Sequence, residues 1–234
     1  MEFMDFFAIT PAELQALWLT FKLAFYTTVI LVVFGAPLAW WLAFTESRWE
    51  SLVSALIALP LVLPPTVLGF YLLIILGPYG WVGGTMEAMG LDHLAFSFTG
   101  ILIGSVIFSL PFAIQPMREG FASMPRNPIH AAATLGAGPI DRFFTVILPL
   151  ARGGFFTAIV ISFAHTLGEF GVIAMMGGSI PGETKVVSIA IYDYTQGMDY
   201  AAAHRLSAIL LILSFLILAV FYALNRRFMA PLKL

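Results

Sequence analysis

The sequence contains no cysteine and few charged residues. Of its 234 residues only 10% are charged, whereas 60% are hydrophobic and the mean hydropathy is +0.96. Without cysteine the chain has no disulfide, no thiolate metal site and no cysteine nucleophile. A soluble domain carries roughly 25% charged residues, so this chain must turn most of its surface toward lipid. Its net charge of −2 also argues against nucleic acid as a partner.

Metal-binding and nucleotide-binding patterns are absent as well. The four histidines are not spaced as metal ligands. No G-x-x-x-x-G-K-[ST] sequence occurs, and none of the three lysines follows a glycine. We therefore expect no metal, no cofactor and no enzymatic activity on this chain itself.

What the sequence does contain is long apolar runs. Five of them are long enough to cross a bilayer, which takes about 20 helical residues. The sequence therefore predicts an all-α polytopic membrane protein, with one domain over residues 1–234. The predicted crossings are 18–44, 52–76, 98–117, 154–176 and 203–224.

Lysine and arginine predict the orientation, because near span ends they stay on the cytoplasmic side. With the N-terminus outside, eight of the eleven basic residues fall on cytoplasmic segments: Arg48, Arg118, Arg126, Arg142, Arg152, Arg226, Arg227 and Lys233. Lys185 and Arg205 then lie toward the outer face. The segment 118–152 and the C-terminus are thus predicted to be cytoplasmic. Tryptophans also lie near the predicted interfaces, at Trp18, Trp40, Trp41, Trp49 and Trp81.

The second apolar run is rich in proline. It reads Leu59-Pro60-Leu61-Val62-Leu63-Pro64-Pro65-Thr66-Val67-Leu68-Gly69. Proline cannot donate a backbone hydrogen bond, and in lipid the carbonyls it leaves free must find protein or water. We expect a broken span whose break faces a neighbour or an aqueous path, with a static kink as the alternative.

The fourth run holds a carboxylate, Glu169. At bilayer depth a carboxylate costs at least ~2.5 kcal/mol, so it must face protein or water. One interpretation places it at a dimer axis, where it shapes a gate; the other bonds it to backbone amides of a broken helix at Gly168 or Gly171. Nearby hydroxyls either contact a passing anion or serve helix packing. The candidate pathway residues are Pro64, Pro65, Thr66, Ser162, Thr166 and Glu169.

Residues 126–150 form a short polar segment between two apolar runs. Asn127-Pro128 is a typical helix start, with Asn as the cap, and Gly136 is a typical helix end. After a corner at 137–139, a second short helix is expected over 140–146, with Pro149 interrupting the approach to the fourth span. Two short helices at an angle, the first narrowed by alanines, would fit a groove on another protein. An ordinary amphipathic linker is the alternative.

This segment resembles the Glu-Ala-Ala loop through which permease subunits of ATP-binding-cassette (ABC) importers contact their ATPase. Ala131, Ala132, Gly136, Leu148 and Pro149 match that pattern. His130 stands where the family has Glu, so the family's carboxylate contact is not carried over. The resemblance implies a type I ABC importer permease fold. It assigns the cytoplasmic coupling loop to His130, Ala131, Ala132, Gly136, Ala137, Gly138, Pro139, Leu148 and Pro149.

Three further motifs resemble the oxyanion branch of these permeases. The run 59–69 and the sequences Thr166-Leu167-Gly168-Glu169-Phe170-Gly171 and Ser179-Ile180-Pro181-Gly182-Glu183-Thr184 are similar to molybdate permeases. The Gly-Glu-Phe-Gly element is shared with sulfate and thiosulfate permeases. The resemblance implies a homodimer in the bacterial or archaeal inner membrane, two cytoplasmic ATPase subunits that bind ATP and Mg²⁺, and an external molybdate-binding protein. Tungstate, sulfate and thiosulfate are alternative cargoes.

Two other classes of function stay open from the residues alone. One is a stand-alone ion-coupled secondary transporter in which Glu169 and His165 relay protons. The five unequal runs show no internal repeat, which weakens that reading. The other is a passive membrane scaffold, which leaves the proline-rich run without an explanation.

Overall fold

A computed structural model describes the backbone of residues 9–228 and the side chains of residues 9–223. Within that range every regular element is a helix. The basic residues Arg226, Arg227 and Lys233, which entered the orientation argument, lie outside the described side chains.

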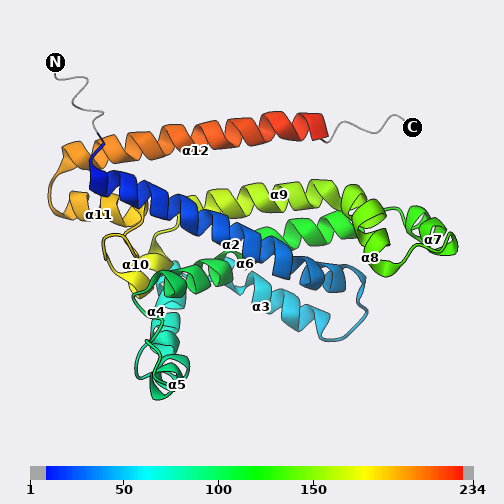
Figure 1. Cartoon of the computed structure of the whole chain (residues 1–234), viewed down its shortest axis with the longest axis horizontal. Helices are drawn as coiled ribbons and strands as arrows, with labels where there is room; N and C mark the ends of the chain where they lie inside the picture. The colour runs from blue at the N-terminus through cyan, green and yellow to red at the C-terminus, as the bar shows by residue number, and fades with distance from the viewer. Residues whose placement is uncertain (1–8, 229–234) are drawn as a thin grey trace.

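Four long helices run along the long axis of the molecule (Figure 1). They are α2 (Pro11–Phe44), α6 (Phe98–Ala122), α9 (Leu148–Leu167) and α12 (Tyr200–Phe228). The first three pack against one another as a central bundle, and α12 lies along one side of it. The helices between them are α3 (Glu50–Val62), α4 (Pro65–Leu76), α5 (Trp81–Ala88), α7 (Asn127–Thr134), α8 (Pro139–Arg142), η1 (Phe143–Ile147), α10 (Gly171–Gly177) and α11 (Val187–Gln196).

Small residues bring the helices of the bundle close together. A Cβ added at Gly154 of α9 would lie 2.4 Å from the carbonyl oxygen of Pro116 and 2.8 Å from Cα of Gly120, both on α6. A Cβ at Gly35 of α2 would lie 2.7 Å from Ile114 of α6. Such contacts allow backbones to approach directly, which is how membrane helices associate without a hydrophobic driving force.

Five helical stretches are long and apolar enough to cross a membrane, as the sequence predicts. They are Pro11–Phe44, Pro65–Ala88, Phe98–Ala122, Pro139–Leu167 and Tyr200–Ala223. The all-α fold with five candidate spans is therefore confirmed. The range 52–76 is divided between α3 and α4, as its prolines predict, and 154–176 is divided between α9 and α10.

An ion pair holds the beginning of the last helix to α2. Arg205 of α12 forms an ion pair with Glu13 of α2 at 2.6 Å, and Glu13 is only 1% exposed. Thr10 and Glu13 also form a reciprocal capping box at the start of α2. Farther along α12 several apolar side chains are exposed and suited to contact with lipid or another chain: Leu211, Ile212, Phe215, Leu216, Val220 and Tyr222.

Residues 177–184 form a turn that is held by hydrogen bonds of Thr184. The hydroxyl of Thr184 donates to the carbonyl of Gly177 at 2.6 Å and accepts from the amide of Ile180. Beyond it, Lys185 pairs with Asp193 at 2.6 Å. Partial burial raises the pKa of Asp193, but hydrogen bonds from Lys185 and Ser179 outweigh that effect and hold the pKa below its ordinary value.

Candidate functional site

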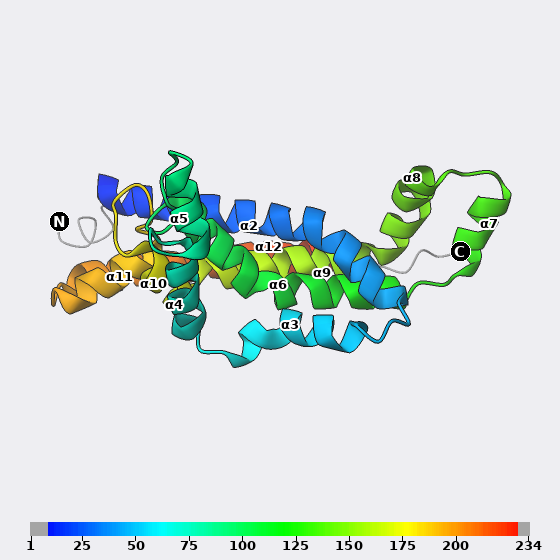
Figure 2. The same ribbon diagram turned by 90° about the horizontal axis from the view of Figure 1, so that it is seen from below.

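The predicted coupling loop projects beyond one end of the bundle (Figure 2). Helix α7 contains no buried residue, and His130, Ala131 and Gly136 are all exposed. The side chain of His130 makes no hydrogen bond or ion pair with any described residue. The loop therefore presents its surface outward, as a docking element must.

Local hydrogen bonds define the end of α7. Gly136 has φ +86, the left-handed conformation that glycine adopts without a Cβ penalty. The amide of Gly136 donates to Ala133 at 3.1 Å and that of Ala137 donates to Ala132 at 3.0 Å. This pair of bonds is a Schellman motif, as the sequence indicates. The expected start is wrong in detail: Asn127 is the first helical residue rather than the cap, and no side chain caps the helix.

The second short helix that the sequence predicts is not a separate element. Helix α8, the π-helical turn η1 and helix α9 follow one another without a break from Pro139 to Leu167. Pro149 has no amide hydrogen to donate. The wider turn, in which Leu148 donates to Phe143, lets the helix pass this residue. Figure 2 shows α8 bent away from the axis of α9. The loop is thus the beginning of a long helix.

Apolar side chains at the corner of the loop escaped the sequence analysis. Leu135 is 87% exposed and Ile140 is 75% exposed, on either side of the Gly136–Pro139 corner. The sequence did hold a signal for an exposed apolar contact, because both residues flank this corner in a segment predicted to be cytoplasmic. Exposed apolar groups of this kind are typical of contacts with another protein.

Two contacts hold the loop to the bundle. Ile129 packs against the core cluster that includes Phe121 and Phe155. The guanidinium of Arg126 lies 5.6 Å from the ring centroid of Phe44 at the end of α2. The loop is therefore attached to the bundle at its base and free at its tip.

The two divided spans meet at their breaks. Helix α3 ends at Val62, and α4 begins at Pro65 and points away from the bundle axis (Figure 1). Helix α9 ends at Leu167, and α10 begins at Gly171. A Cβ added at Gly171 would lie 2.7 Å from Cβ of Pro65. We call this contact between the Pro64–Pro65 break and the Gly168–Phe170 break the break junction.

Helices α4 and α10 remain in direct contact beyond the break junction. A Cβ added at Gly69 would lie 2.8 Å from Met175 and 3.1 Å from the backbone of Val172. On the other side, the hydroxyl of Ser188 on α11 donates to the carbonyl of Glu169 at 2.6 Å. Specific contacts therefore stabilise the break, and the backbone carbonyl of Glu169 finds a hydrogen-bond partner, as a membrane environment requires.

Glu169 lies at the break and is 4% exposed. Both of its carboxylate oxygens are buried without a hydrogen-bond partner among the described residues. The interpretation in which backbone amides at Gly168 or Gly171 bind this carboxylate is therefore wrong. The hydroxyl of Ser105 on α6 faces the carboxylate but does not meet hydrogen-bond geometry.

The other polar groups of this region belong to helix packing. His165 stacks on Phe112 at 4.0 Å and bonds to Ser109 of α6 at 3.0 Å, so it is a satisfied packed side chain. Thr166 donates to the carbonyl of Ser162 at 2.9 Å and lies 3.3 Å from Ser109.

The candidate pathway residues differ in exposure. Ser162 and Thr166 are buried between α6 and α9, whereas Pro64 and Thr66 are exposed at the start of α4. Of the candidate hydroxyls, only that of Thr66 is therefore open to anything outside this chain.

The arrangement has the predicted coupling loop (residues 126–150), called the docking loop below, at one end of α9 and the break junction at the other. The model of one protein family, described as the inner membrane component of binding-protein-dependent transport systems, matches residues 35–230. The chain belongs to this family. Its members are thus multi-pass membrane components of transport systems, in agreement with the five candidate spans.

Curated relatives narrow the comparison within this family. The chain is 50% identical to the "Molybdenum transport system permease protein ModB" of Azotobacter vinelandii, over 96% of this chain and 99% of that one. It is 31% identical to the "Probable sulfate transport system permease protein cysT" of Chlorella vulgaris, over 88% of this chain and 77% of that one. The likeness to the molybdenum permease is thus both closer and more complete.

A solved structure supports the fold. The chain resembles the membrane subunit in the crystal structure of a bacterial alginate ABC transporter bound to its alginate pentasaccharide-loaded periplasmic protein. The TM-score is 0.77 with 18% sequence identity, covering 97% of this chain and 83% of that one. The fold is therefore that of a type I ABC importer permease.

Proposed function

We propose that this chain is the permease subunit of an ATP-driven molybdate importer. The observation that carries the proposal is 50% identity to a molybdenum transport permease over almost the whole length of both chains. Sulfate is the second candidate cargo, because a sulfate permease is similar over most of the chain at lower identity. Tungstate and thiosulfate remain alternatives from the resemblance alone.

The proposed assembly contains two copies of this chain, two cytoplasmic ATPases and an external molybdate-binding protein. The exposed loop supports an ATPase partner, since α7 contains no buried residue and the corner residues Leu135 and Ile140 are largely exposed within the described chain. ATP and Mg²⁺ belong to the ATPase in this proposal. The N-terminus lies outside and the C-terminus inside, so that the loop meets a cytoplasmic partner.

Coupling in this proposal runs along α9. Its twenty residues make a rod of about 30 Å at 1.5 Å per residue. The rod begins at the docking loop and ends at the break junction. Because Gly120 and Gly154 lock it to α6, a displacement of the loop moves both helices together. ATP-driven closure of the ATPases would thus rock the bundle and open the pathway at the junction.

The break junction in this proposal passes the cargo on rather than holding it. No basic side chain occurs at positions 64–66 or 168–171, so tight binding of a dianion belongs to the external binding protein. In the dimer, the exposed Thr66 and the adjoining Pro64 would face the second copy or the pathway.

Reconstitution tests the proposal. Proteoliposomes that contain this chain, its ATPase and its binding protein should accumulate labelled molybdate only when ATP is supplied on the ATPase side. Unlabelled sulfate in excess should compete weakly. Flux driven by an ion gradient through this chain alone would instead support the secondary-transporter alternative and contradict the proposal.

A further inference from the structure

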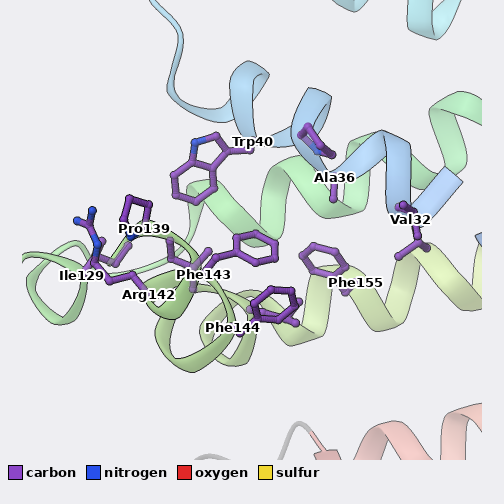
Figure 3. A pocket seen from close by; sticks show the side chains of 13 residues that line it. Val32, Ala36, Trp40, Ile129, Pro139, Arg142, Phe143, Phe144 and Phe155 are labelled. Atoms are coloured by element: carbon purple, nitrogen blue, oxygen red, sulfur yellow. The ribbon is translucent and has the colours of Figure 1, made fainter. Parts of the chain in front are cut away.

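A large apolar cavity lies between the cytoplasmic half of α2 and the segment α8–η1–α9. Its volume is about 720 Å³, within the range of roughly 300–1,000 Å³ typical of small-molecule sites. Figure 3 shows aromatic side chains of the η1–α9 segment facing α2 across it. The residues that enclose its apolar part include Val32, Ala36, Trp40, Phe143, Phe144 and Phe155.

The cavity is open to the surroundings of the protein. Two of its lining residues, Val33 on α2 and Phe144 on η1, are 56% and 61% exposed. An apolar slot of this size exposed at the side of a membrane protein is unfavourable when it is filled with water. The molecules available to fill it are the acyl chains of the surrounding bilayer.

One charged residue, Arg142, lines the cavity. Its Nε atom is buried without a hydrogen-bond partner, and no carboxylate pairs with it among the described residues. A buried donor without an acceptor is costly, and the guanidinium fork matches a phosphate group. The described chain therefore supplies no anionic acceptor for this arginine, and such an acceptor must come from outside the chain.

The charge and the apolar slot lie at opposite ends of the cavity. In Figure 3, Arg142 lies beside Ile129 and Pro139 at the end near the docking loop, whereas Val32 and Phe155 lie at the other end. Trp40 lines the cavity between them, and tryptophan is typical of the membrane–water interface. The cavity is thus polar at the predicted cytoplasmic surface and apolar toward the middle of the membrane.

We propose that this cavity binds an anionic phospholipid of the cytoplasmic leaflet. The phosphate accepts hydrogen bonds from Arg142, and one acyl chain fills the space between α2 and the η1–α9 segment. The lipid then connects α2 to the base of the docking loop and supports the loop at the point where it joins α9. This inference needs the chain to lie in a bilayer with the proposed orientation, but it does not depend on the cargo.

Native mass spectrometry of the intact transporter tests the headgroup contact. Full-length protein with its copurifying subunits is delipidated in mild detergent and titrated with phosphatidylglycerol or phosphatidylethanolamine. Wild type should retain phosphatidylglycerol in preference to phosphatidylethanolamine. Arg142→Gln should lower its retention about tenfold, as expected for one lost charge-assisted hydrogen bond. Arg152→Gln is the control, because Arg152 is exposed on α9 and does not line the cavity.

A second pair of variants tests the acyl-chain slot. Val33→Trp should fill the cavity from its exposed side and reduce retention of both lipids, whereas Val29→Trp, one turn earlier on α2 and also exposed, should not. Equal phosphatidylglycerol retention in wild type and Arg142→Gln would overturn the proposal. So would a photo-crosslinker at Val33 that labelled a second copy of the chain instead of lipid. Molybdate takes no part in these assays, so their outcome is independent of the cargo assignment.

Discussion

The docking loop and the break junction are both interruptions of the helical bundle, but they are built in opposite ways. The loop is exposed, and hydrogen bonds between near neighbours, such as those of Gly136 and Ala137, define its shape. The break junction depends on contacts between residues about a hundred positions apart, such as Pro65 and Gly171. The loop is therefore sensitive to substitution at particular backbone positions such as Gly136, whereas the junction is sensitive to added volume where its two breaks touch, at Pro65 and Gly171.

The largest effect is expected from filling the break junction. Gly171→Leu places a side chain where even a Cβ would lie 2.7 Å from Pro65, and overpacking of this kind costs about 1–3 kcal/mol. ATP-driven uptake in proteoliposomes should fall by about tenfold or more, while the ATPase still copurifies. Gly168→Ala is the matched control, because its nearest neighbour is 3.9 Å away. Unchanged uptake in Gly171→Leu would remove the junction from the mechanism.

At the loop, the expected effect is smaller and comes from the backbone alone. Gly136→Ala adds a methyl group in open space, but at φ +86 it costs about 1–2 kcal/mol. Binding of the ATPase, measured by titration in detergent, should weaken about fivefold to tenfold. Gly138→Ala adds the same group in open space without a positive φ and should bind normally. Equal affinities for the two variants would show that the left-handed helix end is irrelevant to docking.

The exposed corner residues should contribute less individually. Leu135→Ser removes an apolar side chain that is 87% exposed, so packing within the described chain does not account for its presence. If the residue is partly buried on docking, affinity for the ATPase should fall a few-fold, by about 0.5–1 kcal/mol. Leu91→Ser serves as the comparison, because Leu91 is also exposed but lies in the loop between α5 and α6. A loss of affinity shared by both variants would point to a general effect on the fold.

The smallest effect is expected at the edge of the junction. Ser188→Ala removes the hydrogen bond to the carbonyl of Glu169, worth about 1 kcal/mol. Uptake should decline a few-fold without any change in ATPase binding. Ser51→Ala, at an exposed position, should have no effect on either measurement. A change in ATPase binding by Ser188→Ala would show that the two regions are not separable in this way.

The sequence predicted the loop better than the junction for a physical reason. A helix end such as Gly136 is decided by a few adjacent residues, so local patterns are sufficient. Proline likewise revealed the break after Val62. No local pattern showed that Pro65 and Gly171 touch, or that α4 leaves the bundle axis. The environment of Glu169 depends on Ser105 and Ser188, which come from other helices. A local sequence pattern does not show these neighbours, and one interpretation therefore assigned the carboxylate backbone partners that it lacks.

The prediction and the structure also differ in the continuity of the helix that follows the docking loop. Pro149 was expected to interrupt the helix before the fourth span, since proline commonly ends or kinks a helix. A π-helical turn absorbs it instead, and the predicted second short helix becomes the start of α9. This continuity is what joins the two regions mechanically, and a pattern of helix breakers alone could not show it.

The central claim is that α9 carries motion from the docking loop to the break junction. Because the chain has no cysteine, single cysteines can be spin-labelled cleanly at Ala133 on α7 and, in a separate variant, at Thr66 on α4, both exposed positions. Electron–electron distances between the two copies are then compared without nucleotide and with ATP trapped. The account predicts that both distances change together, and that Gly171→Leu abolishes only the change at Thr66. A change at Ala133 with none at Thr66 in the unmodified background would contradict it.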